Sequence, residues 1–166
     1  LEEVSLVNER NNIKQFALNF KNNKETYVPI VYDEFSNNNV LCMEFIDGIK
    51  VTDKAALLNH NINPVVIAEV GLRLFVSQIL DYGFFHADPH AGNILVKKDG
   101  RVVFIDFGAV GKIQPNDKEI LESLIVAFVA KNSNKIVRSL KKMAVSYEIP
   151  DERRFENDVE EVLNFV

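Results

Sequence analysis

A short hairpin between two polar loops is the feature of this sequence that most constrains its fold. Two apolar runs, residues 94–96 and 102–105, are separated by Lys97-Lys98-Asp99-Gly100. Asp-Gly between two apolar runs predicts a tight turn that joins antiparallel strands. The stretch before the first strand, residues 84–92, is dense in His, Asp, Pro and Gly and is expected to be a loop, and residues 106–108 follow the second strand directly. The hairpin therefore predicts two polar segments lying side by side.

These two segments carry oxygen-bearing side chains at spacings that suit phosphoryl transfer. His86, Asp88 and Asn93 keep the spacing of the protein-kinase catalytic loop, in which His-x-Asp is followed by four residues and Asn. Asp106 opens an Asp-Phe-Gly sequence, which supplies a magnesium ligand in that template. Asp and Asn oxygens suit Mg²⁺, and a carboxylate can orient an acceptor hydroxyl. The ordered combination predicts that Asp88, Asn93 and Asp106 converge on one metal–phosphate site.

The rest of the chain is expected to be mostly helical. Apolar residues recur at helical spacing over residues 1–20, 64–82 and 117–129, and further helices are expected over 52–59, 133–145 and from 151 onward. Extended segments are expected over 26–33 and 40–46, with a turn at 36–39 between them. The pattern shows no internal repeat and no clear linker. It predicts an α+β fold.

Two stretches carry a resemblance to a known family. Residues 84–94, Phe-Phe-His-Ala-Asp-Pro-His-Ala-Gly-Asn-Ile, and residues 103–108, Val-Phe-Ile-Asp-Phe-Gly, resemble the UbiB/ADCK family of atypical protein-kinase-like proteins. That family typically has Pro where this chain has Ala91. The resemblance implies a protein-kinase-like fold, mostly the helical C-terminal lobe with a remnant of the small-lobe sheet. In one domain, residues 1–46 would be part of the N-terminal lobe and the hinge, and residues 47–166 the C-terminal lobe.

The resemblance also implies roles for individual residues. Asp88 would be the catalytic aspartate, and Asn93 and Asp106 the metal ligands. Residues 43–46 match the hinge, where the backbone carbonyl of Glu44 and the amide of Ile46 would meet the adenine edge. Glu9 matches the helix glutamate that pairs with the nucleotide-binding lysine. The residues that would support the two loops are His86, Phe107 and Gly108.

ATP and Mg²⁺ are the cofactors that the resemblance implies. It further implies support of isoprenoid-quinone (ubiquinone or menaquinone) biosynthesis, with pathway proteins or lipid as partners, at a membrane-associated cytoplasmic location. The family's nucleotide-binding lysine, alanine-rich loop and K-x-G-Q segment would precede Leu1, so we expect the isolated segment to bind nucleotide weakly. No long activation loop ending in Ala-Pro-Glu follows Gly108. This favours ATP hydrolysis or small-molecule phosphotransfer over protein phosphorylation.

Composition limits the classes of partner and compartment expected for this chain. The 166 residues are 47% hydrophobic and carry a net charge of -5, from 24 acidic and 19 basic residues. Nucleic-acid binders usually have a basic excess, so no nucleic-acid partner is expected. The single cysteine, Cys42, allows no intrachain disulfide and favours a reducing compartment. No apolar run reaches the roughly 18 residues that a membrane span needs.

Other interpretations stay open. A small-molecule phosphotransferase of the aminoglycoside- or choline-kinase type would share these loops and would need an acidic pocket for a cationic substrate. A non-catalytic pseudokinase scaffold is a further alternative, although the three metal-site residues are intact. Locally, Asp88 and Asp106 could be ordinary turn residues. A zinc site built from His86, Asp88 and His90 is a further possibility, which no additional His or Cys cluster supports.

Overall fold

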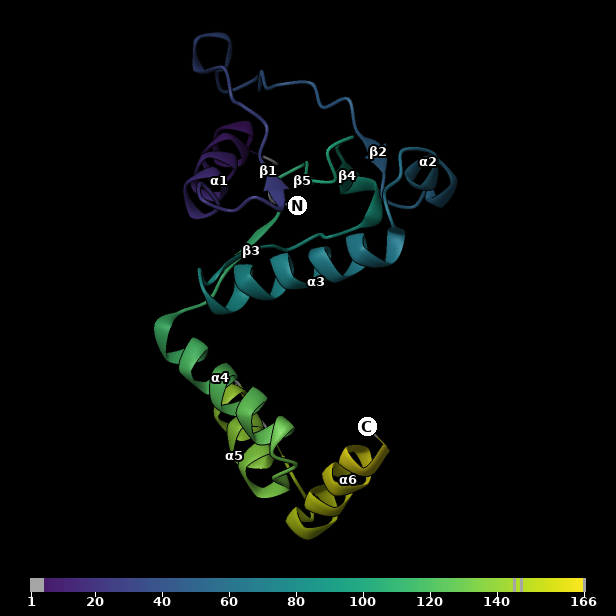
Figure 1. Cartoon of the computed structure of the whole chain (residues 1–166). Coiled ribbons are helices and arrows are strands. Elements are labelled where there is room, and N and C mark those ends of the chain that lie inside the picture. The colour runs from purple at the N-terminus through teal and green to yellow at the C-terminus, as the bar shows by residue number, and fades with distance from the viewer. Residues whose placement is uncertain (1–4, 145, 147, 166) are drawn as a thin grey trace. The chain divides into compact units, whose positions relative to one another are not determined.

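The structure is a computed structural model that describes residues 5–144, 146 and 148–165 (Figure 1). The chain forms two compact units, residues 1–112 and 113–166, which are considered separately. The elements of the first unit are α1 (Leu6–Asn19), β1 (Thr26–Tyr27), the 3₁₀ turn η1 (Asp33–Phe35), β2 (Ile49–Lys50), α2 (Lys54–Asn59), α3 (Pro64–Leu80), β3 (Phe84–His86), the 3₁₀ turn η2 (Ala91–Asn93), β4 (Ile94–Val96), β5 (Val102–Phe104) and β6 (Val110–Lys112). The second unit contains α4 (Pro115–Val129), α5 (Ser133–Met143) and α6 (Glu152–Phe165).

The helices begin at capping residues. The Ser5 hydroxyl accepts a hydrogen bond from the Asn8 amide at 3.4 Å, so α1 starts at Leu6; the expected helical residues 1–4 lie outside the described residues. Asn63 caps α3 in the same way through the Val65 amide, and the left-handed Gly83 follows its C-terminal end. The expected helix over 133–145 ends at Met143 in the structure, and residue 145 is outside the described part.

The predicted hairpin is the centre of a four-stranded sheet in the order β1-β5-β4-β2. Strands β4 and β5 pair antiparallel, with Ile94 opposite Phe104 and Val96 opposite Val102, and Gly100 has the positive φ of the turn. Strand β1 adds parallel to β5, and β2 adds antiparallel to β4. Figure 1 shows these strands between α1 and α2, with α3 passing below them.

A second, two-stranded sheet was not predicted from the sequence. Strand β3 pairs antiparallel with β6, so that Phe85 lies opposite Gly111 and His86 opposite Val110. A Cβ atom on Gly111 would lie 2.1 Å from the Phe85 ring, so a larger residue there would have to displace that ring. The expectation of a loop over residues 84–92, from its His, Asp, Pro and Gly content, is therefore wrong for residues 84–86. The strand depends on a partner more than twenty residues away, for which local periodicity gives no signal.

The expected strand over residues 40–46 is reduced to a single bridge between Val31 and Met43. Two backbone hydrogen bonds flank it, from the Tyr32 amide to the Cys42 carbonyl and from the Glu44 amide to the Ile30 carbonyl. Pairing cannot extend further, because Pro29 has no N–H group and the chain turns into η1 after Tyr32. The expected extended segment over 26–33 is shortened for the same reason.

The core of the first unit joins α1, α3 and the hairpin. Its fully buried members include Phe16, Leu74, Val102, Phe104 and Phe107. The second unit has its own small core around Ala127, Ile136 and Leu163. Among the described residues, no helix is long and apolar enough to cross a lipid bilayer.

Candidate active site

The loop between β3 and β4 places Asp88 and Asn93 next to one another. The Asn93 amide nitrogen lies 3.4 Å from the Asp88 carboxylate and 3.3 Å from the Asp88 carbonyl oxygen. The turn η2 between them is closed by His90, whose Nδ1 accepts the Gly92 amide at 3.0 Å. Since the Asn93 nitrogen donates toward Asp88, the amide oxygen of Asn93 is left for another ligand.

His86 ties this loop to the segment that carries Asp106. Its ring is completely buried. Its Nδ1 accepts a hydrogen bond from the Asp88 amide at 3.2 Å, and its Nε2 lies 3.1 Å from the Ile105 carbonyl oxygen. A backbone amide can only donate and a carbonyl can only accept, so these bonds select the tautomer with the proton on Nε2. The His86 imidazole therefore connects Asp88, in the first loop, with Ile105, the residue before Asp106.

Gln78 is a supporting residue that the sequence analysis did not identify. Its side-chain oxygen accepts the backbone amide of His86 at 2.8 Å, and the side chain is fully buried on α3. Its amide nitrogen has no hydrogen-bond partner among the described residues. The available signal was a polar residue at a core-facing position of an otherwise apolar helix, four residues after the buried Leu74.

Asp106 lies directly beyond the hairpin, next to the position of Asn93. The Ile105 amide donates to the Asn93 carbonyl at 2.9 Å, which continues the β4–β5 ladder up to these loops. Asp106 has φ +61°, in the left-handed region that costs a non-glycine residue about 1 kcal/mol or more and is concentrated at functional sites. Its carboxylate is exposed and accepts the Gly108 amide at 3.3 Å.

Helix α1 lies against the Asp-Phe-Gly segment. The Asn12 side chain donates to the Phe107 carbonyl at 2.9 Å, a contact that the sequence analysis also missed. Glu9, one turn earlier, is 8% exposed. Burial raises the pKa of Glu9, the Asp106 carboxylate raises it further, and a hydrogen bond with the Phe107 backbone lowers it. Among the described residues Glu9 forms no ion pair, so two carboxylates share this region without a cation.

The Phe107 ring anchors this segment in the core. It is 1% exposed and packs 5.0 Å from the Phe16 ring and 5.3 Å from the His86 ring, measured between centroids. Gly108 is exposed and contributes its amide to Asp106. The segment is thus held by a buried ring while the carboxylate before it faces solvent.

The predicted hinge is an extended segment fixed through the Glu44 side chain. Its carboxylate accepts the Tyr27 hydroxyl at 2.7 Å and the Ile30 amide at 3.2 Å. The hydrogen bond to Glu44, followed by burial, raises the pKa of Tyr27 to about 12. In the part of the chain that the structure describes, neither the Glu44 carbonyl nor the Ile46 amide forms a hydrogen bond, so both backbone groups are available to a ligand.

The donor set suits a hard divalent cation better than zinc. Among the described residues, no group of three or more His, Cys, Asp or Glu side chains could hold a metal ion. Both ring nitrogens of His86 are already hydrogen-bonded, which removes it from the possible zinc site with Asp88 and His90. The Asp106 carboxylate and the Asn93 amide oxygen are the kind of ligands that Mg²⁺ prefers, and the uncompensated charge of Glu9 and Asp106 favours a cation nearby.

Comparisons with known proteins found a matching family model, sequence relatives and a solved structure of similar fold. The model of the ABC1 atypical kinase-like domain matches residues 1–140. An uncharacterised Synechocystis protein is 40% identical over 131 residues, which are 79% of this chain and 23% of that protein. The probable protein kinase UbiB of Haemophilus ducreyi is 39% identical over 140 residues, 82% of this chain and 26% of the relative.

The chain spans about a fifth to a quarter of the length of these relatives. The chloroplastic protein ACTIVITY OF BC1 COMPLEX KINASE 1 of Arabidopsis thaliana is 35% identical over 143 residues, which are 86% of this chain and 21% of that protein. A Mycobacterium tuberculosis protein solved in complex with erythromycin superposes with a TM-score of 0.66 at 22% identity, over 97% of this chain and 41% of the other. This last likeness shows a shared fold.

Proposed function

Since the chain belongs to the family of ABC1 atypical kinase-like domains, and the expected mostly helical, kinase-like α+β fold is confirmed, we propose that it binds ATP with Mg²⁺ and transfers or hydrolyses the γ-phosphate. The observation that carries the proposal is the joining of the two loops. The Asp88–Asn93 pair and the residue before Asp106 are held together by the His86 ring and by the β4–β5 ladder.

Each polar residue of the site has a role in this proposal. Asp106 and Asn93 would hold the metal ion, which when bound neutralises charge on the phosphates. Asp88 would orient the attacking oxygen of water or of an acceptor hydroxyl. Its carboxylate is exposed, and the Asn93 amide lies 3.4 Å away, so the nucleophile would meet Asp88 next to the metal. Positioning and charge neutralisation would supply most of the rate enhancement.

The nucleotide would lie against the hinge. The unpaired Glu44 carbonyl and Ile46 amide form an acceptor and a donor two residues apart, which suits the adenine edge. Glu9 would pair with the nucleotide-binding lysine that the family resemblance implies. The buried carboxylate of Glu9 beside Asp106 supports this role, because a buried charge requires a partner.

The wider biological role rests on resemblance. Relatives named probable protein kinase UbiB match more than four-fifths of the chain. We therefore propose that the protein supports isoprenoid-quinone biosynthesis at a cytoplasmic, membrane-associated location, with pathway proteins or lipid as partners.

The test is the stabilisation of the protein by ATP with Mg²⁺ in a thermal-unfolding assay, together with phosphate release. Asp106→Asn should abolish the stabilisation and leave the fold intact. Asp88→Asn should keep the stabilisation and lower turnover by about a hundredfold or more. Asp99→Asn, at the hairpin tip, is the matched control: it removes a carboxylate that pairs, within the described part of the chain, with the nearby Arg101, and it should change neither quantity.

Unchanged stabilisation in Asp106→Asn would contradict the metal assignment. Normal nucleotide binding without any turnover in the wild-type protein would favour the pseudokinase alternative. Phosphorylation of a cationic small molecule would favour the aminoglycoside- or choline-kinase alternative.

A further inference from the structure

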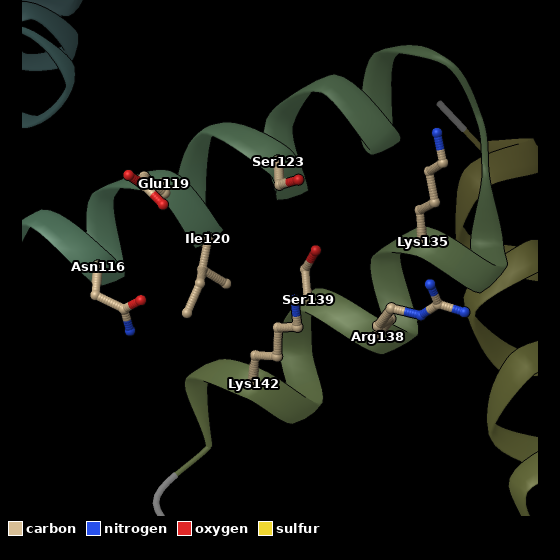
Figure 2. A pocket seen from close by; sticks show the side chains of 8 residues that line it. All are labelled: Asn116, Glu119, Ile120, Ser123, Lys135, Arg138, Ser139 and Lys142. Carbon is tan, nitrogen blue, oxygen red and sulfur yellow. The ribbon is translucent and has the colours of Figure 1, made fainter.

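A polar cavity in the second unit lies outside the proposed nucleotide site. Helices α4 and α5 form a helical hairpin whose turn is closed by the Lys131 and Asn132 amides, and Asn132 caps α5 through the Lys135 amide at 3.0 Å. The small, buried Ala127 lies near this turn. The two helices border a cavity of about 600 Å³, lined by side chains from both (Figure 2). A volume of this size is typical of small-molecule sites.

Three cationic side chains of α5 line this cavity. Lys135, Arg138 and Lys142 follow at intervals of three and four residues, so they share one face of the helix. None of the three forms an ion pair among the described residues. By contrast Lys141, which does not line the cavity, pairs with Glu152 at 2.5 Å. Among the described residues of α5, the cations without an ion pair are therefore those on the cavity face.

The positive charge of the cavity is only partly compensated. Glu119 on α4 is the single carboxylate among its lining residues, against three cations. Neighbouring like charges repel one another unless a counter-ion lies between them. Lys142 is in the last turn of α5, where the helix dipole alone would favour a cation, but this does not account for Lys135 and Arg138 nearer the N-terminal end.

Neutral hydrogen-bond donors complete the cavity. Ser139 is 7% exposed, yet its hydroxyl forms no hydrogen bond among the described residues. A helical serine commonly bonds the carbonyl four residues earlier, and this one does not. Figure 2 shows the Ser139 hydroxyl directed into the space between the helices, with Ser123 on the facing helix. A hydroxyl that faces the cavity without a hydrogen-bond partner, beside several cations, is suited to an oxyanion.

We propose that the cavity between α4 and α5 binds a phosphate group, separately from the nucleotide site. Arg138 would hold two of its oxygens through its planar guanidinium, Lys135 and Lys142 would supply charge, and Ser139 would donate one hydrogen bond. The phosphate group would belong to a small soluble compound or to a lipid headgroup, since both present the same oxyanion to the cavity.

The first test uses pyrophosphate and isothermal titration calorimetry with a chelator in place of Mg²⁺. Arg138→Gln with Lys142→Gln should weaken binding by about tenfold or more for each charge removed, and Ser139→Ala severalfold. The matched control is Arg153→Gln with Arg154→Gln, which removes the same charge from exposed positions on α6 and should leave binding unchanged. Asp106→Asn should also leave it unchanged, which separates this site from the nucleotide site.

The second arm uses phosphatidylcholine vesicles with and without phosphatidylglycerol. Vesicle binding that needs the anionic lipid and is lost only in the cavity variant would identify a headgroup, whereas a loss confined to pyrophosphate would identify a soluble compound. Circular dichroism confirms that each variant is folded. No saturable binding in either arm, or an equal loss in the cavity and α6 variants, would overturn the proposal.

Discussion

Replacing His86 by phenylalanine tests whether the two loops of the active site are joined as described. Phenylalanine keeps a planar ring in the same core position, against the rings of Phe104 and Phe107. It removes both ring hydrogen bonds, to the Asp88 amide and to the Ile105 carbonyl. The substitution therefore separates hydrogen bonding from packing.

The expected cost follows from the two bonds. They are 3.2 Å and 3.1 Å long, and each net hydrogen bond contributes about 1 kcal/mol. The Asp88 amide belongs to an exposed residue and can turn to water, but the Ile105 carbonyl is partly buried, which adds up to about 1 kcal/mol for an unpaired polar group. We expect His86→Phe to lower the free energy of unfolding by about 2–3 kcal/mol.

The assays are chemical denaturation and steady-state phosphate release. A displacement of Asp88 relative to Asp106 should reduce turnover by about tenfold to a hundredfold, with a smaller effect on nucleotide affinity. His60→Phe is the control, because it also removes an imidazole with one hydrogen bond, to the Ala56 carbonyl, but at an exposed position outside the site. If His86→Phe changed the unfolding free energy by less than about 0.5 kcal/mol and left turnover unaltered, the coupling of the loops through His86 would be refuted.

Three further predictions concern residues around the site. Gly71→Ala should raise the unfolding free energy by about 0.5–1 kcal/mol in denaturant titrations, because Gly71 lies within α3 and an added Cβ meets no atom within 4 Å; a loss of stability would contradict the open space at this position. Burial and the Asp106 carboxylate raise the pKa of Glu9, so folding favours the protonated form of Glu9. The contribution of Glu9 to the free energy of unfolding is therefore fully present below its ordinary pKa of 4.5 and is lost as the pH rises through the raised pKa. Glu9→Gln should therefore gain stability relative to wild type as the pH rises from below 4.5 through the raised pKa, and a difference that stays constant with pH would contradict the shift. In an ultraviolet titration, one of the four tyrosines should ionise near pH 12; this step should disappear in Tyr27→Phe and move toward 10 in Glu44→Gln, and its persistence in both variants would assign it elsewhere.

The parts of the fold that could be predicted from sequence are those specified by neighbouring residues. The β4–β5 hairpin, the capped helices and the position of Asp106 beyond the second strand all depend on turn residues and local apolar periodicity. The β3–β6 sheet and the contact of Asn12 depend on partners far along the chain. Gln78 bonds His86, which is only eight residues later but lies beyond the end of α3, where helical periodicity gives no signal. A polar residue on a buried helix face marks such a contact but does not reveal its partner.

The residues of the candidate site likewise differ in whether local sequence predicts them. The spacing of Asp88, Asn93 and Asp106 is visible in the sequence because the hairpin places them locally. The hinge at Glu44 and the helix position of Glu9 came only from family resemblance, and the sequence pattern contains no physical signal for the bond from Tyr27 or for the approach of α1 to Phe107.

The close fit of Gly111 over the Phe85 ring has a consequence for how this protein tolerates genetic variation. A larger residue at 111 would displace the Phe85 ring, next in sequence to His86, and a resulting shift of His86 would reach Asp88 without any contact to a ligand. In a randomised library selected for turnover, position 111 should be as depleted of substitutions as Asp106 itself. Selection for glycine at position 111 would then reflect a steric requirement of the fold, although the pattern of depleted substitutions would look like that of a catalytic residue.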